Sequence, residues 1–142
     1  VATTINGVPI FEKNRSVNCV TLQNNGRSVS VTSGSTIGWA KDISREFACP
    51  TGQVITGVTN RLTLLLERQW QVQCGKVANG NATIVPVTTL SGPVKDGPIV
   101  SCPANTVLTS IAGSCNGILC LPALKVTVVC SKVTLNLPSF PL

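Results

Sequence analysis

Short runs of alternating apolar and polar residues, separated by Gly, Pro and Asn, make up most of the chain, and no segment keeps a helical period. In residues 28–32, two valines alternate with polar residues, which is typical of a half-buried strand. The Asn25-Gly26 pair before them favours a hairpin turn, because both residue types tolerate a positive φ. Many short strands with such turns predict an all-β sandwich, barrel or prism.

The remaining segments differ in how strongly they indicate a strand. Residues 1–16 indicate an extended arm with one edge strand at 8–11, whereas residues 17–22 indicate a strand. The Ser-Gly-Ser-Thr sequence at 33–36 predicts a loop. The apolar run at 62–66 is too short for a helix and predicts a loop edge or a buried strand. Further strands are expected at 37–40 and 82–89, with an extended strap after 135.

Two segments of the chain repeat one another. Residues 47–58 open with Phe-Ala-Cys-Pro, and residues 100–111 match them position by position from Val-Ser-Cys-Pro onward. Residues 125–133 likewise match the closing strand at 69–77. The opening cysteines of the two units are 53 residues apart and the closing cysteines are 56 apart. A period of this length predicts an internally repeated architecture, with units at about 38–77 and 92–133.

Two further details extend the repeat. Gly52 of the first unit becomes Asn105 in the second, and both residue types tolerate a left-handed backbone, so the same turn is expected. Residues 17–22 resemble 129–135, the end of a unit, which indicates a fragment of a third copy. Repeated two-strand units that each need partners favour several small antiparallel sheets around a shared core, in a prism-like arrangement.

The composition is that of a single all-β domain spanning residues 1–142. At 142 residues with 43% apolar residues, the chain is large enough for a sizeable core. The charged fraction of 11% is low, so the surface must consist mostly of Ser, Thr, Asn, Gln and Gly. This balance is common in secreted β-proteins.

Seven cysteines in strand-like sequence indicate disulfides and an oxidising compartment. The simplest pairing lies within the repeated units and joins Cys49 with Cys74 and Cys102 with Cys130. We predict these two bridges on grounds of economy, because the sequence alone does not determine connectivity.

The three other cysteines have different expectations. Cys115 and Cys120 are close enough in the sequence to close a small ring. Cys19 is left over and is expected to be a free thiol or an intermolecular link, which would give a homo-oligomer. No metal site is expected, because the chain has no His and no Cys-x-x-Cys pair.

Several features indicate a secreted glycoprotein. Asn14 and Asn81 each begin an Asn-x-Ser/Thr sequon beside Gly or charged residues, so both are expected to carry glycan at the surface. The chain begins at Val1 without a leader, which indicates a mature chain after signal cleavage. No apolar run reaches about 18 residues, so no membrane span is expected.

The net charge of +6 comes from basic residues that are scattered singly along the chain. A nucleic-acid-binding arm or a membrane-binding cluster would need a block of basic residues, so neither partner is expected. A diffuse positive field is instead suited to acidic polysaccharide.

Catalytic chemistry finds little support in the residues present. Without His, no Ser-His or Cys-His pair exists. A glycosidase needs two carboxylates that flank one bond. Nothing in the sequence pairs any two of the five acidic residues, Glu12, Asp42, Glu46, Glu67 and Asp96. No enzymatic activity, catalytic residue or cofactor is therefore predicted.

Arg68 and Trp70 are the most notable side chains for binding. Alternate residues of a strand share a face, so Trp70 is expected to point into the core against the disulfide, with Arg68 bonded to Glu67 or to a backbone carbonyl. The alternative is an exposed pair in which Trp70 stacks on a sugar and Arg68 binds sulfate or carboxylate. In that alternative the ligand-binding face also includes Arg45, Arg61 and Lys76.

Trp39, which is expected in the core, precedes a Cys49-Pro-Thr-Gly-Gln-Val-Ile segment and a Glu67-Arg-Gln-Trp-x-x-x-Cys74 closure. These residues resemble the dermatopontin family of extracellular-matrix proteins, which repeats a Cys-Pro-x-Gly-x-x-Ile segment and an Asp-Arg-x-Trp-x-x-x-Cys closure. Glu67 replaces the usual Asp, the second unit lacks the Arg-x-Trp pair, and the chain has none of the tyrosine in which the family is rich. A similar Cys-Pro repeat occurs in the egg vitelline outer-layer proteins, which form a three-sheet prism.

The resemblance implies a secreted, non-enzymatic structural or adhesive protein of the extracellular matrix that binds acidic polysaccharide such as glycosaminoglycan, matrix proteins or cells. The alternative is a secreted lectin or defence protein that recognises a specific sugar. Ionic strength separates the two functions, because charge-driven binding weakens steeply with salt and binding led by stacking does not.

Overall fold

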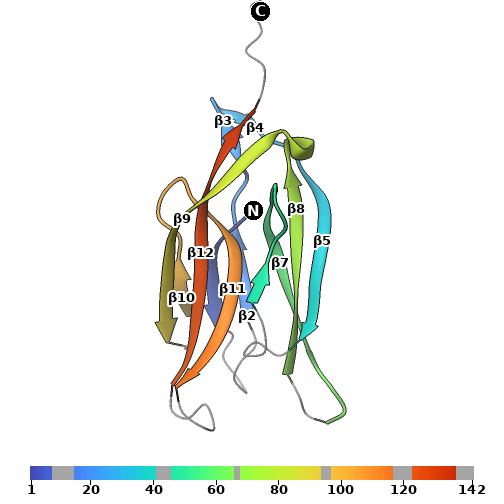
Figure 1. Ribbon diagram of the computed structural model, residues 1–142, viewed down its shortest axis with the longest axis vertical. Coiled ribbons are helices and arrows are strands. Elements are labelled where there is room, and N and C mark those ends of the chain that lie inside the picture. Colours follow the sequence, from blue (N-terminus) through green and yellow to red (C-terminus); the bar gives the residue numbers. More distant parts are fainter. Residues whose placement is uncertain (8–14, 41–45, 66–67, 94–96, 117–122, 137–142) are drawn as a thin grey trace, which may run out of the picture.

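The computed structural model describes residues 1–7, 15–40, 46–65, 68–93, 97–116 and 123–136. Within these ranges the chain forms antiparallel strands and one short 3-10 turn, η1 (Ala78–Gly80), and has no α-helix. The strands build three main sheets and a two-stranded hairpin in an elongated molecule (Figure 1). The predicted all-β class with several small antiparallel sheets is confirmed.

The first sheet has the order β5-β8-β7 and consists of β5 (Val31–Ala40), β7 (Gln53–Leu62) and β8 (Arg68–Val77). Its central strand β8 turns Trp70, Val72 and Cys74 to the core, as the alternation predicts, and none of the three is more than 3% exposed. The expected loop at 33–36 is wrong, because these residues stay in β5 as an irregularity in its pairing with β8.

The second sheet has the order β6-β11-β12-β9 and contains the second repeated unit. Its strands are β6 (Glu46–Ala48), β9 (Ala82–Pro93), β11 (Val107–Asn116) and β12 (Ala123–Leu135). β9 lies beside β12 as β5 lies beside β8, so each unit has three strands rather than the two that the sequence indicates.

The third sheet has the order β10-β1-β2 and is built from β1 (Ala2–Gly7), β2 (Arg15–Cys19) and β10 (Gly97–Ser101). The interpretation of residues 1–16 as an arm is therefore wrong for β1, which is the central strand of this sheet. The edge strand expected at 8–11 lies outside the described residues. The hairpin β3 (Gln23–Asn24) and β4 (Arg27–Ser28) turns through Asn25 and Gly26, both at positive φ, as predicted.

Each of the three main sheets contains one hairpin, and the three hairpins pair their strands in equivalent registers. Ile55 lies opposite Cys74, Leu108 opposite Cys130, and Ala2 opposite Cys19. In each hairpin the residue that follows has no partner in the ladder, which therefore skips it. These skipped residues are Thr56, Thr109 and Thr3. The three threonines are spaced by 53 residues, so β1–β2 is the hairpin of a third copy, of which the sequence comparison found only the end.

All three sheets contribute to one apolar core. Its buried residues include Ile5 from the third sheet, Trp70 and Val72 from the first, and Ile111 and Val128 from the second. Since each sheet is apolar on one face, the shared core buries three faces at once.

Two disulfides join the corners of the repeated units to their closing strands. They are Cys49–Cys74 and Cys102–Cys130, the two pairs that the repeat predicts. The two corners also have the same backbone conformation. Gly52 has φ 80° and Asn105 has φ 65°, both in the left-handed region that their residue types tolerate.

Candidate functional site

Trp70 is a core residue and not part of a binding surface. Its side chain is 1% exposed, and its ring stacks on Phe47 with 6.0 Å between the centroids. The expectation of an exposed Trp70 that stacks on a sugar is therefore wrong, because this face of β8 is turned toward the other two sheets.

Arg15 is the buried cationic neighbour of Trp70, and nothing in the local sequence sets it apart from the other scattered basic residues. It is 1% exposed, and its guanidinium carbon lies 4.1 Å from the Trp70 ring centroid. Asn60 of β7 holds its backbone, since the Arg15 N–H donates to Asn60 Oδ1 at 3.1 Å and Asn60 Nδ2 donates to the Arg15 carbonyl at 2.6 Å. The contact with the Trp70 ring favours the cation at this depth, and the Asn60 hydrogen bonds fix the backbone that carries it, so Arg15 serves the fold.

Arg61 and Trp39 form a second arginine–tryptophan pair, this one at the surface. The guanidinium carbon of the exposed Arg61 lies 4.2 Å from the Trp39 ring centroid. Its Nε and Nη2 donate to Gln69 Oε1 at 2.9 and 2.7 Å. Trp39 is half-buried and lies outside the core, so its expected place in the core is wrong. The indole and the amide together hold the planar guanidinium in one orientation.

The other basic residues of the predicted ligand-binding face do not all gather around Arg61. The backbone of Arg68 pairs with Leu62, next to Arg61, while the Arg68 side chain lies outside the described part of the structure. Arg45 also lies outside it. Lys76 is exposed at the far end of β8, about 27 Å from Arg68 at the rise of a strand. The predicted grouping of Lys76 with Arg68 and Arg61 is therefore wrong.

The loop that joins β7 to β8 adds apolar surface beside Arg61. Leu62, Leu64 and Leu65 are 49%, 103% and 88% exposed. With Thr63, Gln69 and Arg61 they line a shallow hollow. We call this surface, made of Trp39, Arg61, Gln69 and the loop at 62–65, the arginine–tryptophan face. Leu62 is the last residue of β7, and residues 63–65 form a loop, which agrees with the loop-edge interpretation of residues 62–66.

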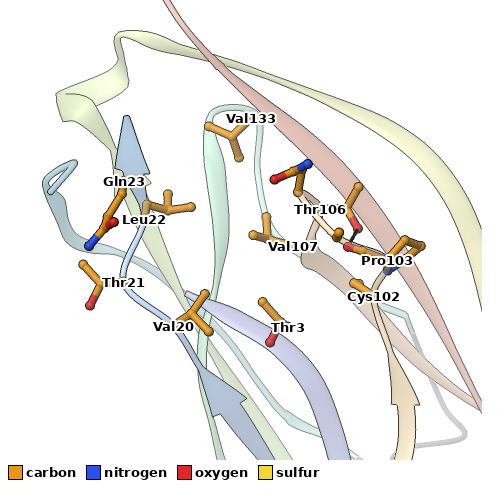
Figure 2. A pocket seen from close by; sticks show the side chains of 12 residues that line it. Thr3, Val20, Thr21, Leu22, Gln23, Cys102, Pro103, Thr106, Val107 and Val133 are labelled. Atoms are coloured by element: carbon orange, nitrogen blue, oxygen red, sulfur yellow. Dashed lines mark hydrogen bonds between the residues drawn. The ribbon is translucent and has the colours of Figure 1, made fainter. Parts of the chain in front are cut away.

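A separate groove lies beside the Cys-Pro corner of the second unit and has a volume of about 480 Å³ (Figure 2). One wall is the segment 20–23 that follows β2, and the other is the corner at 102–107. The Thr106 hydroxyl donates to the Pro103 carbonyl at 2.7 Å and braces the corner. None of the described residues that line the groove is charged, and its polar groups are the hydroxyls and amides of Thr3, Thr21, Gln23, Asn105 and Thr106.

The corner of the first unit has a related but smaller hollow of about 330 Å³. Glu46 contributes to its lining, and the Ser110 hydroxyl donates to Glu46 Oε1 at 2.5 Å. The equivalent groove of the second unit, which we call the corner groove, is lined only by uncharged side chains in the part of the chain that the structure describes. The two repeats therefore offer different chemistry at equivalent places.

The predicted modification sites are described in part. Asn81 is exposed directly after η1, and its carbonyl accepts a hydrogen bond from the Asn136 N–H at 2.8 Å. Cys19 is exposed and is a free thiol. Asn14, Cys120 and the side chain of Cys115 lie outside the described residues.

Three further expectations concern metal ligands, membrane spans and paired carboxylates. Within them, no three His, Cys, Asp or Glu side chains come together as potential metal ligands. No helix in that part of the chain has the length and apolar character needed to cross a membrane. Of the five acidic residues, Glu46 is described, and the other four lie outside the described residues.

Comparison of the chain with protein-family models, with curated proteins and with solved structures finds no match. The relation to the dermatopontin family therefore stays a prediction from the motifs. The arginine–tryptophan face and the corner groove are the two candidate binding sites of the described residues.

Proposed function

We propose that this protein is a secreted, non-enzymatic structural or adhesive protein of the extracellular matrix that binds acidic polysaccharide, and that it is a distant relative of the dermatopontin family. Two disulfides and an exposed Asn81 sequon support an oxidising, extracellular location. A net charge of +6 supports attraction to a polyanion. Three sheets around one core support the prism-like arrangement.

The observation that carries the proposal is the orientation of Arg61. A guanidinium has five N–H donors in a fixed plane, and Gln69 takes two of those of Arg61. The others are available to a sulfate or carboxylate, which guanidinium groups bind through paired hydrogen bonds. Since stacking on Trp39 already restricts the side chain, binding loses little further conformational freedom.

The test compares two variants that each lose one positive charge. Arg61→Gln removes the oriented guanidinium, whereas Lys125→Gln removes an exposed charge from β12, in another sheet. We expect Arg61→Gln to elute from a heparin column at clearly lower salt than Lys125→Gln. Equal shifts would show that only the diffuse charge matters, and a wild-type protein that fails to bind heparin at low salt would refute the proposal.

The corner groove favours a second candidate, a secreted lectin or defence protein that recognises a specific neutral sugar. Its hydroxyl and amide groups are those that bind sugar hydroxyls, and its described lining residues are all uncharged. A glycan array at two salt concentrations separates the candidates. Binding of a neutral glycan that is unchanged by salt and lost in Gln23→Ala would favour the lectin.

A further inference from the structure

Two of the three repeated hairpins receive a short strand from a neighbouring unit. In the second sheet β6 adds to β11 and sets Phe47 opposite Ile111. In the third sheet β10 adds to β1 and sets Val100 opposite Ile5. Each of these short strands runs directly into a Cys-Pro corner. We call them the docking strands.

The corner that follows each docking strand is held by the same backbone group. The Cys49 N–H donates to the Thr109 carbonyl at 3.0 Å, and the Cys102 N–H donates to the Thr3 carbonyl at 2.8 Å. Both acceptors are the threonines skipped by the ladder in their hairpins. The corner cysteine then forms its disulfide with the closing strand of its own unit.

The third hairpin, β7–β8, has the same acceptor but no docking strand among the described residues. Its skipped residue is Thr56, and β7 is the edge strand of its sheet. The Thr56 carbonyl accepts a hydrogen bond from the free Cys19 thiol at 3.5 Å. Cys19 is the closing cysteine of the third unit, so the third disulfide position and the third corner position lie together.

Two residues around this position are less buried than their equivalents in the other two hairpins. Val58 is half-buried, although its equivalents Ile5 and Ile111 are fully buried under their docking strands. Cys19 is exposed, although the closing cysteines of the other two hairpins are 0% and 3% exposed. β2 lies along this edge of β7 through the side chains of Asn60 and Cys19, without forming a ladder with it. A docking strand would take the place of β2 at this edge and cover Val58.

We propose that the edge of β7 beside Cys19 binds a third docking strand of the pattern apolar-x-Cys-Pro, and that the cysteine of this strand forms a disulfide with Cys19. The apolar residue lies opposite Val58, as Val100 lies opposite Ile5. The cysteine N–H donates to the Thr56 carbonyl in place of the Cys19 thiol. The occupant is therefore a strand of the kind that this chain already uses twice.

The disulfide forms by thiol–disulfide exchange. The thiolate of Cys19 attacks the corner cysteine of a strand that carries it as a mixed disulfide with a small thiol. The new S–S bond forms as the old one breaks, the small thiol leaves as a thiolate that takes up the proton of Cys19, and no further oxidant is needed.

A synthetic peptide tests the docking of the strand. The peptide copies residues 97–105 and carries its cysteine as a mixed disulfide with glutathione; the matched control differs by Val100→Asp. We expect the native peptide to label Cys19 of the full chain about tenfold faster than the control, because strand pairing raises the local concentration of the reacting sulfur. Labelling is mapped by mass spectrometry, and Cys19→Ser abolishes it. Equal rates for both peptides, or a Cys19–Cys19 dimer as the main product, would overturn the proposal.

A tethered strand provides the second test. The ladder of β1 continues to Val1, whose carbonyl accepts from the Val20 N–H at 2.8 Å, so Val1 takes the place of Val107 in the second unit. A copy of residues 97–106 added before Val1 sets its cysteine five residues ahead, the spacing from Cys102 to Val107. We expect Cys19 to become bonded to the added cysteine and Tm to rise by about 5–10 °C relative to the same extension with serine. A Cys19 thiol that still reacts with a thiol reagent, at unchanged Tm, would refute the proposal.

Discussion

Two arginine–tryptophan pairs lie in this molecule at almost the same separation, 4.1 Å for Arg15–Trp70 and 4.2 Å for Arg61–Trp39, but in different surroundings. The first is buried among all three sheets, and the second lies at the surface of one sheet. A cation–π contact is worth about 0.5–1 kcal/mol when exposed and about 2 kcal/mol or more when desolvated. The environment, rather than the contact distance, therefore decides what each pair contributes.

The two arginines also differ in whether a ligand can reach them. The guanidinium of Arg15 is enclosed by protein, so a ligand in solution does not reach it. The guanidinium of Arg61 is exposed, and Trp39 and Gln69 orient it. Removing the buried pair should therefore lower stability, whereas removing the exposed pair should lower affinity for an anion.

The largest effect is expected from the two tryptophans. Trp70→Ala should lower the free energy of unfolding by about 3–5 kcal/mol, the range for removing a large buried side chain. Trp39→Ala, the matched control, should cost about 1 kcal/mol or less, because the ring is half-buried and outside the core. Urea unfolding of both variants measures the difference. Similar losses would contradict the assignment of only one pair to the core.

A smaller effect is expected from the two arginines. Arg15→Ala should cost about 2–3 kcal/mol, because it removes a desolvated cation–π contact and leaves a cavity beside Trp70. Arg61→Ala should cost about 1 kcal/mol or less, as is usual for exposed charged contacts. Thermal unfolding at the same pH and salt measures both. An Arg61 variant that loses as much stability as the Arg15 variant would identify Arg61 as a structural residue.

The smallest effect concerns orientation alone. Gln69→Leu keeps every charge but removes the acceptor of two hydrogen bonds from Arg61. We expect a slightly earlier elution from heparin, between wild type and Arg61→Gln, with the free energy of unfolding changed by about 1 kcal/mol or less. Elution identical to wild type would show that the charge of Arg61, and not its fixed orientation, determines affinity.

The sequence by itself determined those features that depend on short-range chemistry or on the repeat. The Asn25-Gly26 turn follows from the backbone preferences of its two residues, and so does the shared turn at Gly52 and Asn105. The bridge from Cys49 to its closing strand followed from the equivalence of two units. Alternation along β8 also placed Trp70 in the core, because its face carries a bonded cysteine.

Only the tertiary structure decided which segments lie between others. β1 is a central strand because β10 adds to it, and its Thr4 hydroxyl hydrogen-bonds the Ser101 hydroxyl across 97 positions of the chain. Arg15 is buried because β2 lies against β7, which nothing in the local sequence shows. The pairing of β5 with β8 shifts register between Gly38 and Ala40. Because of this shift, the sequence of β5 alone does not show that Trp39 is only half-buried. Side-chain periodicity describes one strand, whereas burial depends on what the other strands bring to each of its faces.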